Sequence, residues 1–272
     1  MIIGIDIGST TTKAVSLEEG RIVKKIKTRA EDAVTSAAGA FGKMMLENSI
    51  KLSEIQRIMI TGVGATKIAG ELFGIPTEKV DEITSIGTGG MYLSGKDSII
   101  IVNIGTGTAI IEAHKDRIVH LGGSGVGGGT ILGLAKKLIS LSDFKDIMAM
   151  AGSGSLDPVD LFMEDIMVMD LGFLNRKSTA SNFGKMLDTA RNEDVALGII
   201  NMVYQVIGMI AVFAARSRNI DRVLVTGSGS YNPLGKEVLD EITRMHSVAF
   251  EYPKDAEYTT AVGAGLWGMN RS

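Results

Sequence analysis

Apolar runs separated by short polar turns fill the first 28 residues, a pattern typical of three consecutive strands. The runs are MIIGIDI, KAVSL and RIVKKIKT, and the turns between them are GSTTT and EEG. Over 31–48, the residues Val34, Ala37, Phe41 and Met44 recur at helical spacing and predict a helix. The order continues with a strand, a helix, a short strand and a helix, which predicts a mixed sheet with helices packed on it. We place these four elements at 57–61, near 66–73, around 77–80 and over 82–93.

The opening pattern returns at about residue 98. SIIIVNIGTGTAIIEAHKDRIVHL again has the pattern strand, Gly/Thr turn, strand, turn, strand, and VNIGTGT aligns with IDIGSTT residue for residue. Two copies of one three-stranded unit, each followed by helices, predict two similar lobes that face each other across a cleft. We expect the hairpin turns to point into this cleft. The predicted boundary divides the chain into an N-terminal lobe of 1–95 and a C-terminal lobe of 96–272.

The second copy is longer and richer in helix. It is predicted to contain a glycine loop, several helices and two further strands. The acidic residues of its middle segment, 143–170, are predicted to lie on a solvated helical face; they are Asp157, Asp160, Glu164, Asp165 and Asp170. The remaining predicted elements are the glycine loop 122–129, the helices 130–140, 193–218, 233–245 and 259–269, and the strands 222–226 and 248–252.

The segment 195–215 carries no charged residue and is long enough to span a bilayer. Asn201 and Gln205 lie near its middle, and charged residues flank both of its ends. We therefore predict a long helix buried between layers or in a subunit interface, and no membrane association.

Composition restricts the function classes. The chain has 45% hydrophobic residues, and 28 Lys and Arg stand against 31 Asp and Glu without a long block of either sign. This balance argues against nucleic acid or an anionic membrane as the partner and favours a small molecule. The absence of cysteine excludes disulfides, Cys-ligated zinc, iron–sulfur clusters and thiol nucleophiles. The apolar run at the N-terminus is too short for a secretory signal, so we expect a cytoplasmic protein.

Four Gly/Ser/Thr turns each follow an apolar strand. Glycine permits close approach of the backbone, and amide and hydroxyl groups supply donors, which are the requirements of a phosphate chain. A single turn of this kind can be an ordinary hairpin, whereas four together favour nucleotide binding. None matches a P-loop or a dinucleotide-binding unit. The turns contain Gly8, Ser9, Thr10 and Thr11; Gly105, Thr106, Gly107 and Thr108; 122–129; and Gly227, Ser228 and Gly229.

Two charged residues flank the first turn. Asp6 stands among isoleucines at the end of the first strand, where an unpaired carboxylate is unfavourable. We predict that Asp6 holds Mg²⁺ through its water shell, the alternative being a buried acid that accepts hydrogen bonds from turn amides. Lys13 could reach a phosphate, or it could be an ordinary exposed strand lysine.

These motifs resemble a known family. IGIDIGSTTTKAV is similar to the first phosphate motif of the acetate kinase, sugar kinase, heat-shock ATPase and actin superfamily. The resemblance to type II pantothenate kinases is more specific and covers nearly the whole chain. It implies a two-lobed α/β, actin-like (ribonuclease H-like) fold with duplicated mixed sheets. Its motifs are KVDE (79–82), VNIGTGT (102–108), HLGGSGVGGGTILGL (120–134), SNFGKM (181–186) and AVGAGL (261–266).

The resemblance implies ATP-dependent phosphorylation of pantothenate, the first step of coenzyme A synthesis, by a homodimer with a long helix in its core. Asp6 matches the magnesium-linked aspartate and Lys13 the phosphate-contacting lysine. Glu82 matches the catalytic base, and Thr106 matches a hydroxyl position of the second turn, near ATP and substrate. The loop around the nucleotide corresponds to Gly125, Gly127, Gly128 and Gly129.

The chemistry of the transfer independently favours Glu82. A primary hydroxyl that attacks phosphorus needs a carboxylate within hydrogen-bond reach to accept its proton. The alternative is that Asp81 and Glu82 only stabilise a helix N-terminus electrostatically.

Two positions depart from the family pattern and leave the acceptor open. His120 stands where the family has an arginine that contacts substrate, and Ala109 where it often has a serine. A kinase for a relative such as pantetheine is therefore an alternative. A further alternative is an ATP-driven activator of the 2-hydroxyacyl-CoA dehydratase type, which shares a DIGSTTTK-like opening. That group uses cysteines to hold an iron–sulfur cluster, and this chain has none.

Overall fold

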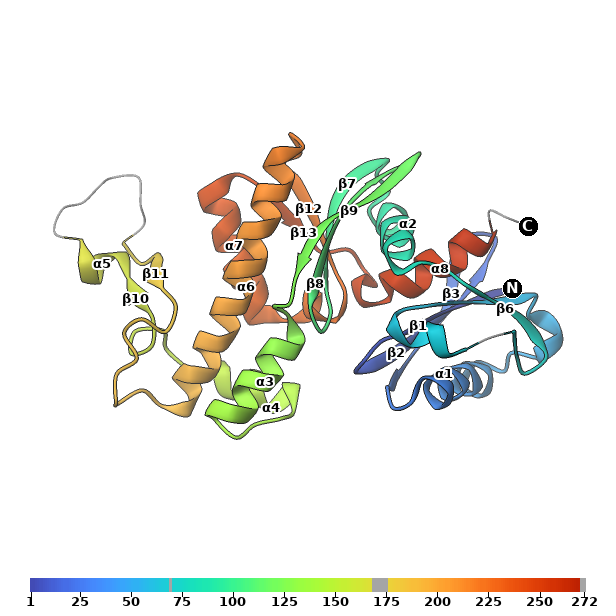
Figure 1. The fold of residues 1–272 in the computed structure, drawn as a ribbon, viewed down its shortest axis with the longest axis horizontal. Coiled ribbons are helices and arrows are strands. Elements are labelled where there is room, and N and C mark those ends of the chain that lie inside the picture. Colours follow the sequence, from blue (N-terminus) through green and yellow to red (C-terminus); the bar gives the residue numbers. More distant parts are fainter. Residues whose placement is uncertain (69, 168–175, 270–272) are drawn as a thin grey trace.

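The computed structural model describes residues 1–68, 70–167 and 176–269, in which two large sheets lie side by side and a separate pair of short strands forms a third, smaller sheet (Figure 1). The first sheet has the order β3-β2-β1-β4-β6-β5. β1 pairs antiparallel with β2 and parallel with β4, so the sheet is mixed, as predicted. Its strands are β1 (Ile2–Ile7), β2 (Thr11–Glu18), β3 (Arg21–Arg29), β4 (Arg57–Thr61), β5 (Glu71–Leu72) and β6 (Ile75–Lys79).

The second sheet repeats the arrangement of the first. Its order is β13-β12-β7-β8-β9, which reproduces β6-β4-β1-β2-β3 strand for strand. The internal repeat predicted from IDIGSTT and VNIGTGT is therefore confirmed. Its strands are β7 (Ser98–Ile104), β8 (Thr108–His114), β9 (Arg117–Ser124), β12 (Arg222–Thr226) and β13 (Ala249–Glu251).

Helices cover both faces of each sheet because alternate apolar side chains point to opposite faces. In β1, Ile3 and Ile5 belong to the core shared with α1 (Ala33–Asn48), whereas Gly4 lies against α8 (Thr259–Met269). In β7, Ile100 and Val102 face α6 (Asn192–Ser217), and Ile99 and Ile101 pack with Ile86 of α2 (Glu82–Ser94). The other long helices of the second half are α3 (Gly128–Leu138), α4 (Phe144–Ala151) and α7 (Pro233–His246).

Helices α2 and α8 cross each other between the sheets. A Cβ atom at Gly89 would lie 2.0 Å from the carbonyl oxygen of Thr259, and one at Gly263 would lie 1.7 Å from that of Ser85. The two backbones are therefore in direct contact, which glycine alone permits. α2 follows the first sheet in sequence but packs on the second sheet. α8 follows the second sheet in sequence but packs on the first sheet. The division of the chain near residue 95 stays a prediction.

The prediction of a helix near 66–73 is wrong. A short 3₁₀ helix, Val63–Lys67, is followed by β5 and β6, which pair through Leu72 and Ile75. Phe73 and Gly74 form the turn between them with φ angles of 55° and 75°. Two successive residues with positive φ form a tight hairpin turn and cannot continue a right-handed helix. The Phe73 ring stacks on Phe41 at a centroid distance of 5.3 Å.

The acidic segment 143–170 is not one exposed helix either. After α4 the chain forms β10 (Leu161–Phe162) and α5 (Met163–Ile166), and β10 pairs with β11 (Thr179–Ser181). Asp160 is fully buried and accepts hydrogen bonds from Asn201 Nδ2 at 2.7 Å and from the Phe183 amide at 2.9 Å. Its predicted place on a solvated face is therefore wrong, because tertiary hydrogen bonds stabilise the buried carboxylate. Asp170 lies outside the described residues.

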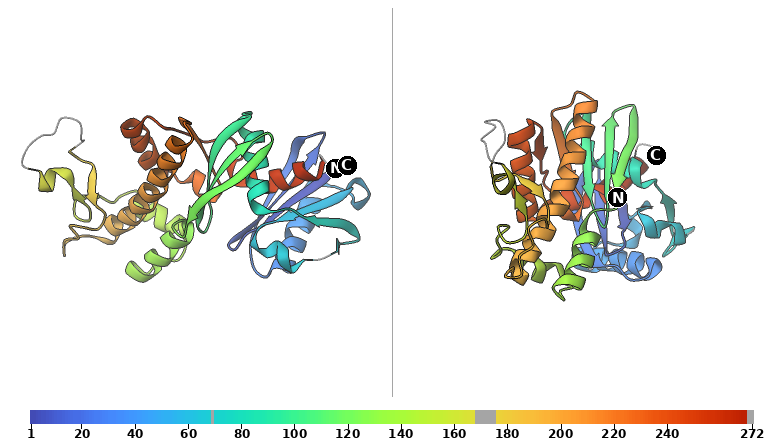
Figure 2. Two further views of the ribbon diagram at one scale, coloured as in Figure 1. Left: turned by 45° about the horizontal axis from the view of Figure 1, so that its top comes forward. Right: turned by 60° about the vertical axis from the view of Figure 1, so that its left-hand side comes forward.

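The predicted long helix is confirmed as α6, which has 26 residues and packs along the second sheet (Figure 2). Within the described part of the chain it is the one helix long and apolar enough to cross a membrane, and 67% of its most apolar window is buried inside the molecule. Gln205 donates to Thr179 Oγ1 at 3.1 Å. With the bond from Asn201 to Asp160, this contact attaches the β10–β11 pair to α6.

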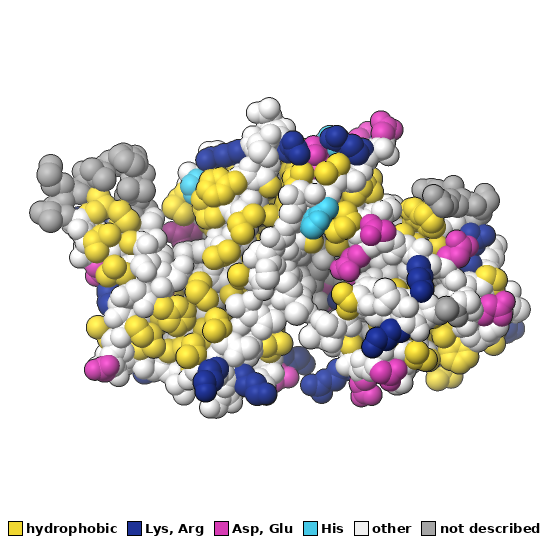
Figure 3. Space-filling view, in the orientation of Figure 1, with side chains coloured by type: hydrophobic (Ala, Val, Ile, Leu, Met, Phe, Trp, Pro, Cys, Tyr) yellow, Lys and Arg dark blue, Asp and Glu magenta, His cyan; other side chains and the backbone are white. Residues whose placement is uncertain are grey.

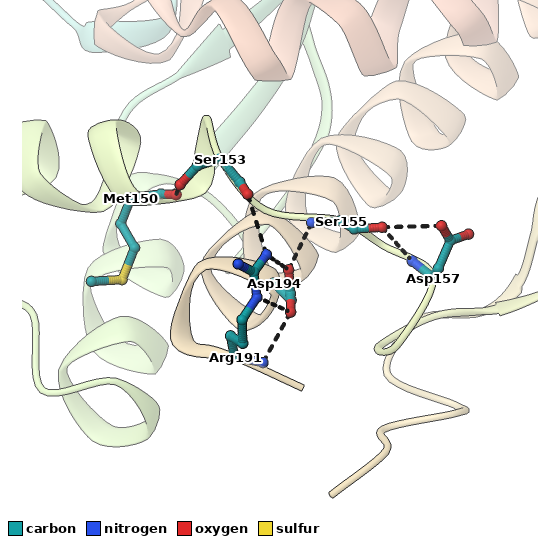
Figure 4. A network of polar contacts seen from close by, with 6 residues as sticks. All are labelled: Met150, Ser153, Ser155, Asp157, Arg191 and Asp194. Carbon is teal, nitrogen blue, oxygen red and sulfur yellow. Dashed lines mark hydrogen bonds and ion pairs between the residues drawn. The ribbon is translucent and has the colours of Figure 1, made fainter. Parts of the chain in front are cut away.

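The start of α6 is held by a hydrogen-bond network around Asp194 (Figure 4). Its carboxylate accepts from the Arg191 amide at 2.9 Å and from the Ser155 amide at 2.8 Å. The Arg191 guanidinium lies 3.1 Å from the same carboxylate. These hydrogen bonds and the positive charge lower the pKa of Asp194 from 3.8 to about 2. The network anchors the loop after α4 to the helix N-terminus.

We expect Asp194→Asn to lower the free energy of unfolding at pH 7 by about 1–2 kcal/mol, because the variant loses the negative charge that pairs with Arg191 at the helix N-terminus. Because the pKa is lowered in the folded state, the contribution of Asp194 is complete above its unfolded value of 3.8 and is lost as the pH falls towards about 2. Urea unfolding of both proteins between pH 7 and pH 2 measures this. Asp157→Asn, at an exposed acid of the same loop, is the control. A difference that does not shrink on acidification would contradict the assignment.

Candidate active site

A cavity of about 750 Å³ lies between the two sheets, and Figure 3 shows the surface hollowed between the two halves of the molecule. It is lined by the turns that follow β1, β4, β7 and β12 and by the first residues of α2. Gly125 and Gly127 do not line it. The predicted site residues that do are Asp6, Gly8, Ser9, Thr10, Thr11, Lys13, Glu82, Gly105, Thr106, Gly107, Thr108, His120, Gly128, Gly129, Gly227, Ser228 and Gly229.

Asp6 lies at the end of β1, opposite Thr61 of β4 and Lys13 of β2. Lys13 Nζ is 3.9 Å from Asp6 Oδ2, and both side chains are largely buried. Burial raises the pKa of Asp6, and the charge of Lys13 opposes this shift. A Cβ atom at Gly62 would lie 2.6 Å from Asp6 Oδ1, so glycine keeps the space in front of this oxygen free.

The corresponding position of the second sheet carries an amide. Asn103 lies opposite Thr226, whose hydroxyl donates to Asn103 Oδ1 at 3.0 Å. Gly227 lies over Asn103, just as Gly62 lies over Asp6. The φ angles of the two glycines are 81° and 87°. Of the two repeat copies, the first supplies the carboxylate.

Sequence reasoning missed the turn at Gly62. TGVG at 61–64 matches TGSG at 226–229, because both turns follow the central parallel strand of their sheet. Gly62 and Val63 line the cavity from the first sheet, as Gly227 and Ser228 do from the second. The repeat itself was the available signal.

The second turn and the glycine loop bind each other. The amides of Gly128 and Gly129 donate to the carbonyl oxygens of Gly105 and Thr106, each at 2.9 Å. Thr108 donates its hydroxyl to the Val126 carbonyl at 2.8 Å. These amides and this hydroxyl are therefore engaged inside the protein, and the glycines permit two backbones to pack closely. Thr106 Oγ1 remains on the cavity side, 2.5 Å from Ser9 Oγ of the first turn.

Glu82 begins α2 at the junction of the two sheets. Asp81 is the N-cap and accepts from the Thr84 amide at 2.9 Å, so the helix-stabilising role applies to Asp81. Glu82 is half-buried in the cavity wall. Burial raises its pKa most, and the negative charges of Asp6 and Asp81 raise it further, against the opposing effect of Lys13. This arrangement places a carboxylate of raised basicity beside the turns.

One end of the cavity lies over β8 and β9. Ala109 pairs with Gly123, and Ile111 pairs with His120, with a register shift between Ile110 and Ile111. Residues opposite each other on neighbouring strands point to the same face, so Ala109, Ile111 and His120 share the face covered by α2. The His120 side chain is exposed at the rim.

The opposite end is apolar. Ile131 and Leu132 of α3, Phe144 of α4 and Tyr204 of α6 line it beside Gly229. The Tyr204 hydroxyl donates to the Gly229 carbonyl at 2.6 Å, which connects the core helix to the last turn. Sequence reasoning missed these four residues because their pattern is that of ordinary core positions.

A family model named Fumble matches residues 96–233, half of the chain. A type II pantothenate kinase of Bacillus anthracis is 29% identical over 99% of this chain and 98% of its own length. The type II pantothenate kinase of Staphylococcus haemolyticus (strain JCSC1435) is 28% identical over 97% and 98%.

Solved structures share the fold. The activator of the 2-hydroxyisocaproyl-CoA dehydratase from Clostridium difficile, with bound ADPNP, has a TM-score of 0.72 at 17% identity and covers 99% of this chain and 94% of its own. A ROK family glucokinase from Streptomyces griseus, in complex with glucose and AMPPNP, has a TM-score of 0.62 at 16% identity and covers 98% of each chain. These likenesses confirm the predicted actin-like α/β fold class.

Proposed function

The chain belongs to the Fumble family, and we propose that it is a cytoplasmic kinase that transfers the γ-phosphoryl group of ATP to the primary hydroxyl of pantothenate, the first step of coenzyme A biosynthesis. The observation that carries this proposal is the composition of one cavity. It contains the hairpin turns of both sheets, the Asp6–Lys13 pair and the Glu82 carboxylate. Donors for phosphate and an acceptor for a proton thus lie in one space.

In this proposal, ATP lies along the cavity. Ser9, Thr10 and Thr106 offer hydroxyl groups, and Lys13 a positive charge, for the phosphate chain. The apolar end formed by Leu132, Phe144 and neighbouring residues suits a nucleobase. The turn of Gly227–Gly229 would then lie beside the adenosine, because it lines the cavity next to Tyr204.

The residues present fit Mg²⁺ at Asp6. Gly62 leaves Asp6 Oδ1 open to the cavity. The described residues contain no cluster of three His, Cys, Asp or Glu side chains that could hold a metal ion elsewhere. Asp6 would hold the ion together with water and phosphate oxygens, which is the usual coordination of Mg²⁺. When bound, the ion supplies charge stabilisation at the phosphate oxygens.

Glu82 acts as the general base in this proposal. The acceptor hydroxyl oxygen forms a bond to the γ-phosphorus, while the bond between this phosphorus and the bridging oxygen to the β-phosphate breaks and ADP leaves. The hydroxyl proton passes to the Glu82 carboxylate. Lys13 and the turn hydroxyls orient the phosphate chain for this displacement.

Glu82→Gln is expected to lower kcat by roughly 10²–10⁴-fold and to leave ATP binding nearly unchanged, since the amide cannot accept the proton. The wild-type rate should fall on acidification through a pKa above the ordinary value of 4.5, because the base must be ionised and its pKa is raised. Steady-state rates from pH 4 to pH 9 measure both effects. A variant rate within threefold of wild type would remove Glu82 from the mechanism.

The acceptor end favours a second candidate, a relative of pantothenate such as pantetheine. His120 offers fewer hydrogen-bond donors than arginine, and Ala109 has no hydroxyl. His120 and Ala109 both line the cavity, so the two departures from the family pattern meet at one place. The site therefore binds a polar, carboxylate-bearing acceptor more weakly than a site with arginine and serine would.

We expect the double variant His120→Arg with Ala109→Ser to raise kcat/KM for pantothenate by roughly ten- to hundredfold, the equivalent of one charged hydrogen bond of about 1.5–3 kcal/mol. The same variant should change kcat/KM for pantetheine little. Coupled ADP-release assays with both acceptors measure the ratio. Efficient wild-type use of pantothenate, together with impairment by the double change, would show that other residues compensate.

We also propose a homodimer formed through α6. This helix is buried on the side facing the second sheet, whereas Met202, Val206, Met209 and Ile210 are only partly buried and Phe213 is 62% exposed. These apolar residues follow one stripe of the helix, as in a helix that packs against a partner. Sedimentation velocity at micromolar concentration should show a dimer, and Phe213→Glu should shift it towards monomer. A wild-type monomer would contradict the proposal.

The likeness to the dehydratase activator, at 17% identity, shows a shared fold alone. The resemblance to that activator group implies cysteines that hold an iron–sulfur cluster, and this chain has no cysteine. ATP turnover that needs a protein partner and no small acceptor would favour that function over a kinase.

A further inference from the structure

A row of polar side chains crosses the first sheet at the cavity. The strand register aligns Thr61 of β4 with Asp6 of β1, Asp6 with Lys13 of β2, and Lys13 with Lys27 of β3. Residues aligned in this way point to the same face of the sheet, which here is the face covered by α8. Lys27 therefore extends the Asp6–Lys13 pair by one strand, towards the edge of the sheet.

Lys27 lines the cavity, and its ammonium is held by one carboxylate. Lys27 Nζ lies 2.6 Å from Oε2 of Glu257, in the 3₁₀ turn Ala256–Tyr258 that precedes α8. The side chain of Lys27 is 43% exposed and that of Glu257 17% exposed. A solvated ion pair of this kind contributes little to stability and is easily exchanged.

The charges around the cavity are unfavourable for a polyanion. In the described part of the chain, the lining contains the two ammonium groups of Lys13 and Lys27 against the three carboxylates of Asp6, Glu82 and Glu257. Both ammonium groups already lie beside a carboxylate. A triphosphate needs positive charge, and the two ion pairs partly neutralise the positive charge in the cavity. Of the two ammonium groups, that of Lys27 is the more exposed.

We propose that Lys27 is a phosphate-binding residue that Glu257 competes for. Entry of the nucleotide exchanges the Lys27–Glu257 ion pair for a contact between Lys27 and the phosphate chain, and Glu257 is released to solvent. This inference rests on the proposed binding of ATP. It makes two predictions of opposite sign, because loss of Lys27 weakens binding whereas loss of the Glu257 charge strengthens it.

The chain contains a matched control two residues away. Lys25 lies on the same strand, forms an ion pair with Asp255, and lies 5.5 Å from the centroid of the Tyr258 ring. Neither Lys25 nor Asp255 lines the cavity. A purely structural connection between β3 and the segment before α8 would make the two pairs equivalent, whereas phosphate binding by Lys27 would distinguish them.

The test is equilibrium binding of ATP, ADP and adenosine to the full chain in the presence of Mg²⁺ and without acceptor, measured by calorimetry. Lys27→Met should weaken ATP binding by about tenfold, ADP binding by less, and adenosine binding not at all, since only phosphates meet Lys27. Glu257→Gln should tighten ATP binding severalfold. Lys25→Met and Asp255→Asn should leave all three affinities within twofold of wild type.

The outcomes separate this inference from the function on which it rests. Failure of the wild type to bind any of the three ligands would overturn the proposed kinase activity. ATP binding by the wild type with an unchanged Lys27→Met, or with equal losses in Lys27→Met and Lys25→Met, would overturn the role of Lys27 alone. Weaker ATP binding by Glu257→Gln would show that Glu257 supports the nucleotide and does not compete with it. Thermal unfolding of each variant verifies that the chain is folded.

Discussion

The direct contact between the backbones of α2 and α8 determines how the two sheets meet. Gly89 and Gly263 permit a separation that any side chain would prevent, and each helix packs on the sheet built by the other half of the chain. Both helices begin at the cavity, which Glu82 of α2 and Thr260 of α8 line. One close crossing thus brings a carboxylate to the turns of two separate sheets, and the proposed chemistry depends on that convergence.

Duplication supplies the rest of the site, and divergence between the copies makes it asymmetric. Each copy provides a hairpin turn after its first strand and a Thr-Gly turn after its central parallel strand. The first copy carries Asp6 where the second carries Asn103, whose Oδ1 already accepts a hydrogen bond from Thr226. A single buried carboxylate then suits one cation, and the neutral copy leaves room for the remainder of a nucleotide. The polar row from Asp6 to Lys27 belongs to the charged copy alone.

Local pattern predicted most of the fold. The strand–turn–strand repeats, α1, α2, α6 and α8 follow from spacing and end signals, although Val34 of the predicted apolar face of α1 is exposed. The errors have tertiary causes: Gly74 turns an expected helix into a hairpin, and Asp160 is buried because Asn201 reaches it from α6. Of the site, glycine and threonine turns were readable from the sequence, whereas Phe144, Tyr204 and Lys27 carry no local signal of a cavity position. The roles assigned to Glu82 and Asp6 stay predictions.

In the proposed reaction, the acceptor's own hydroxyl oxygen attacks the γ-phosphorus inside this cavity. The decisive experiment uses pantothenate labelled with ¹⁸O at its primary hydroxyl, with purified protein, Mg²⁺ and ATP and with mass spectrometry of the products. We expect one phosphorylated pantothenate per ADP, with the label retained in the bond between the acceptor and phosphorus. ADP formation that is independent of pantothenate, or inorganic phosphate as the only phosphorus-containing product besides ADP, would contradict it.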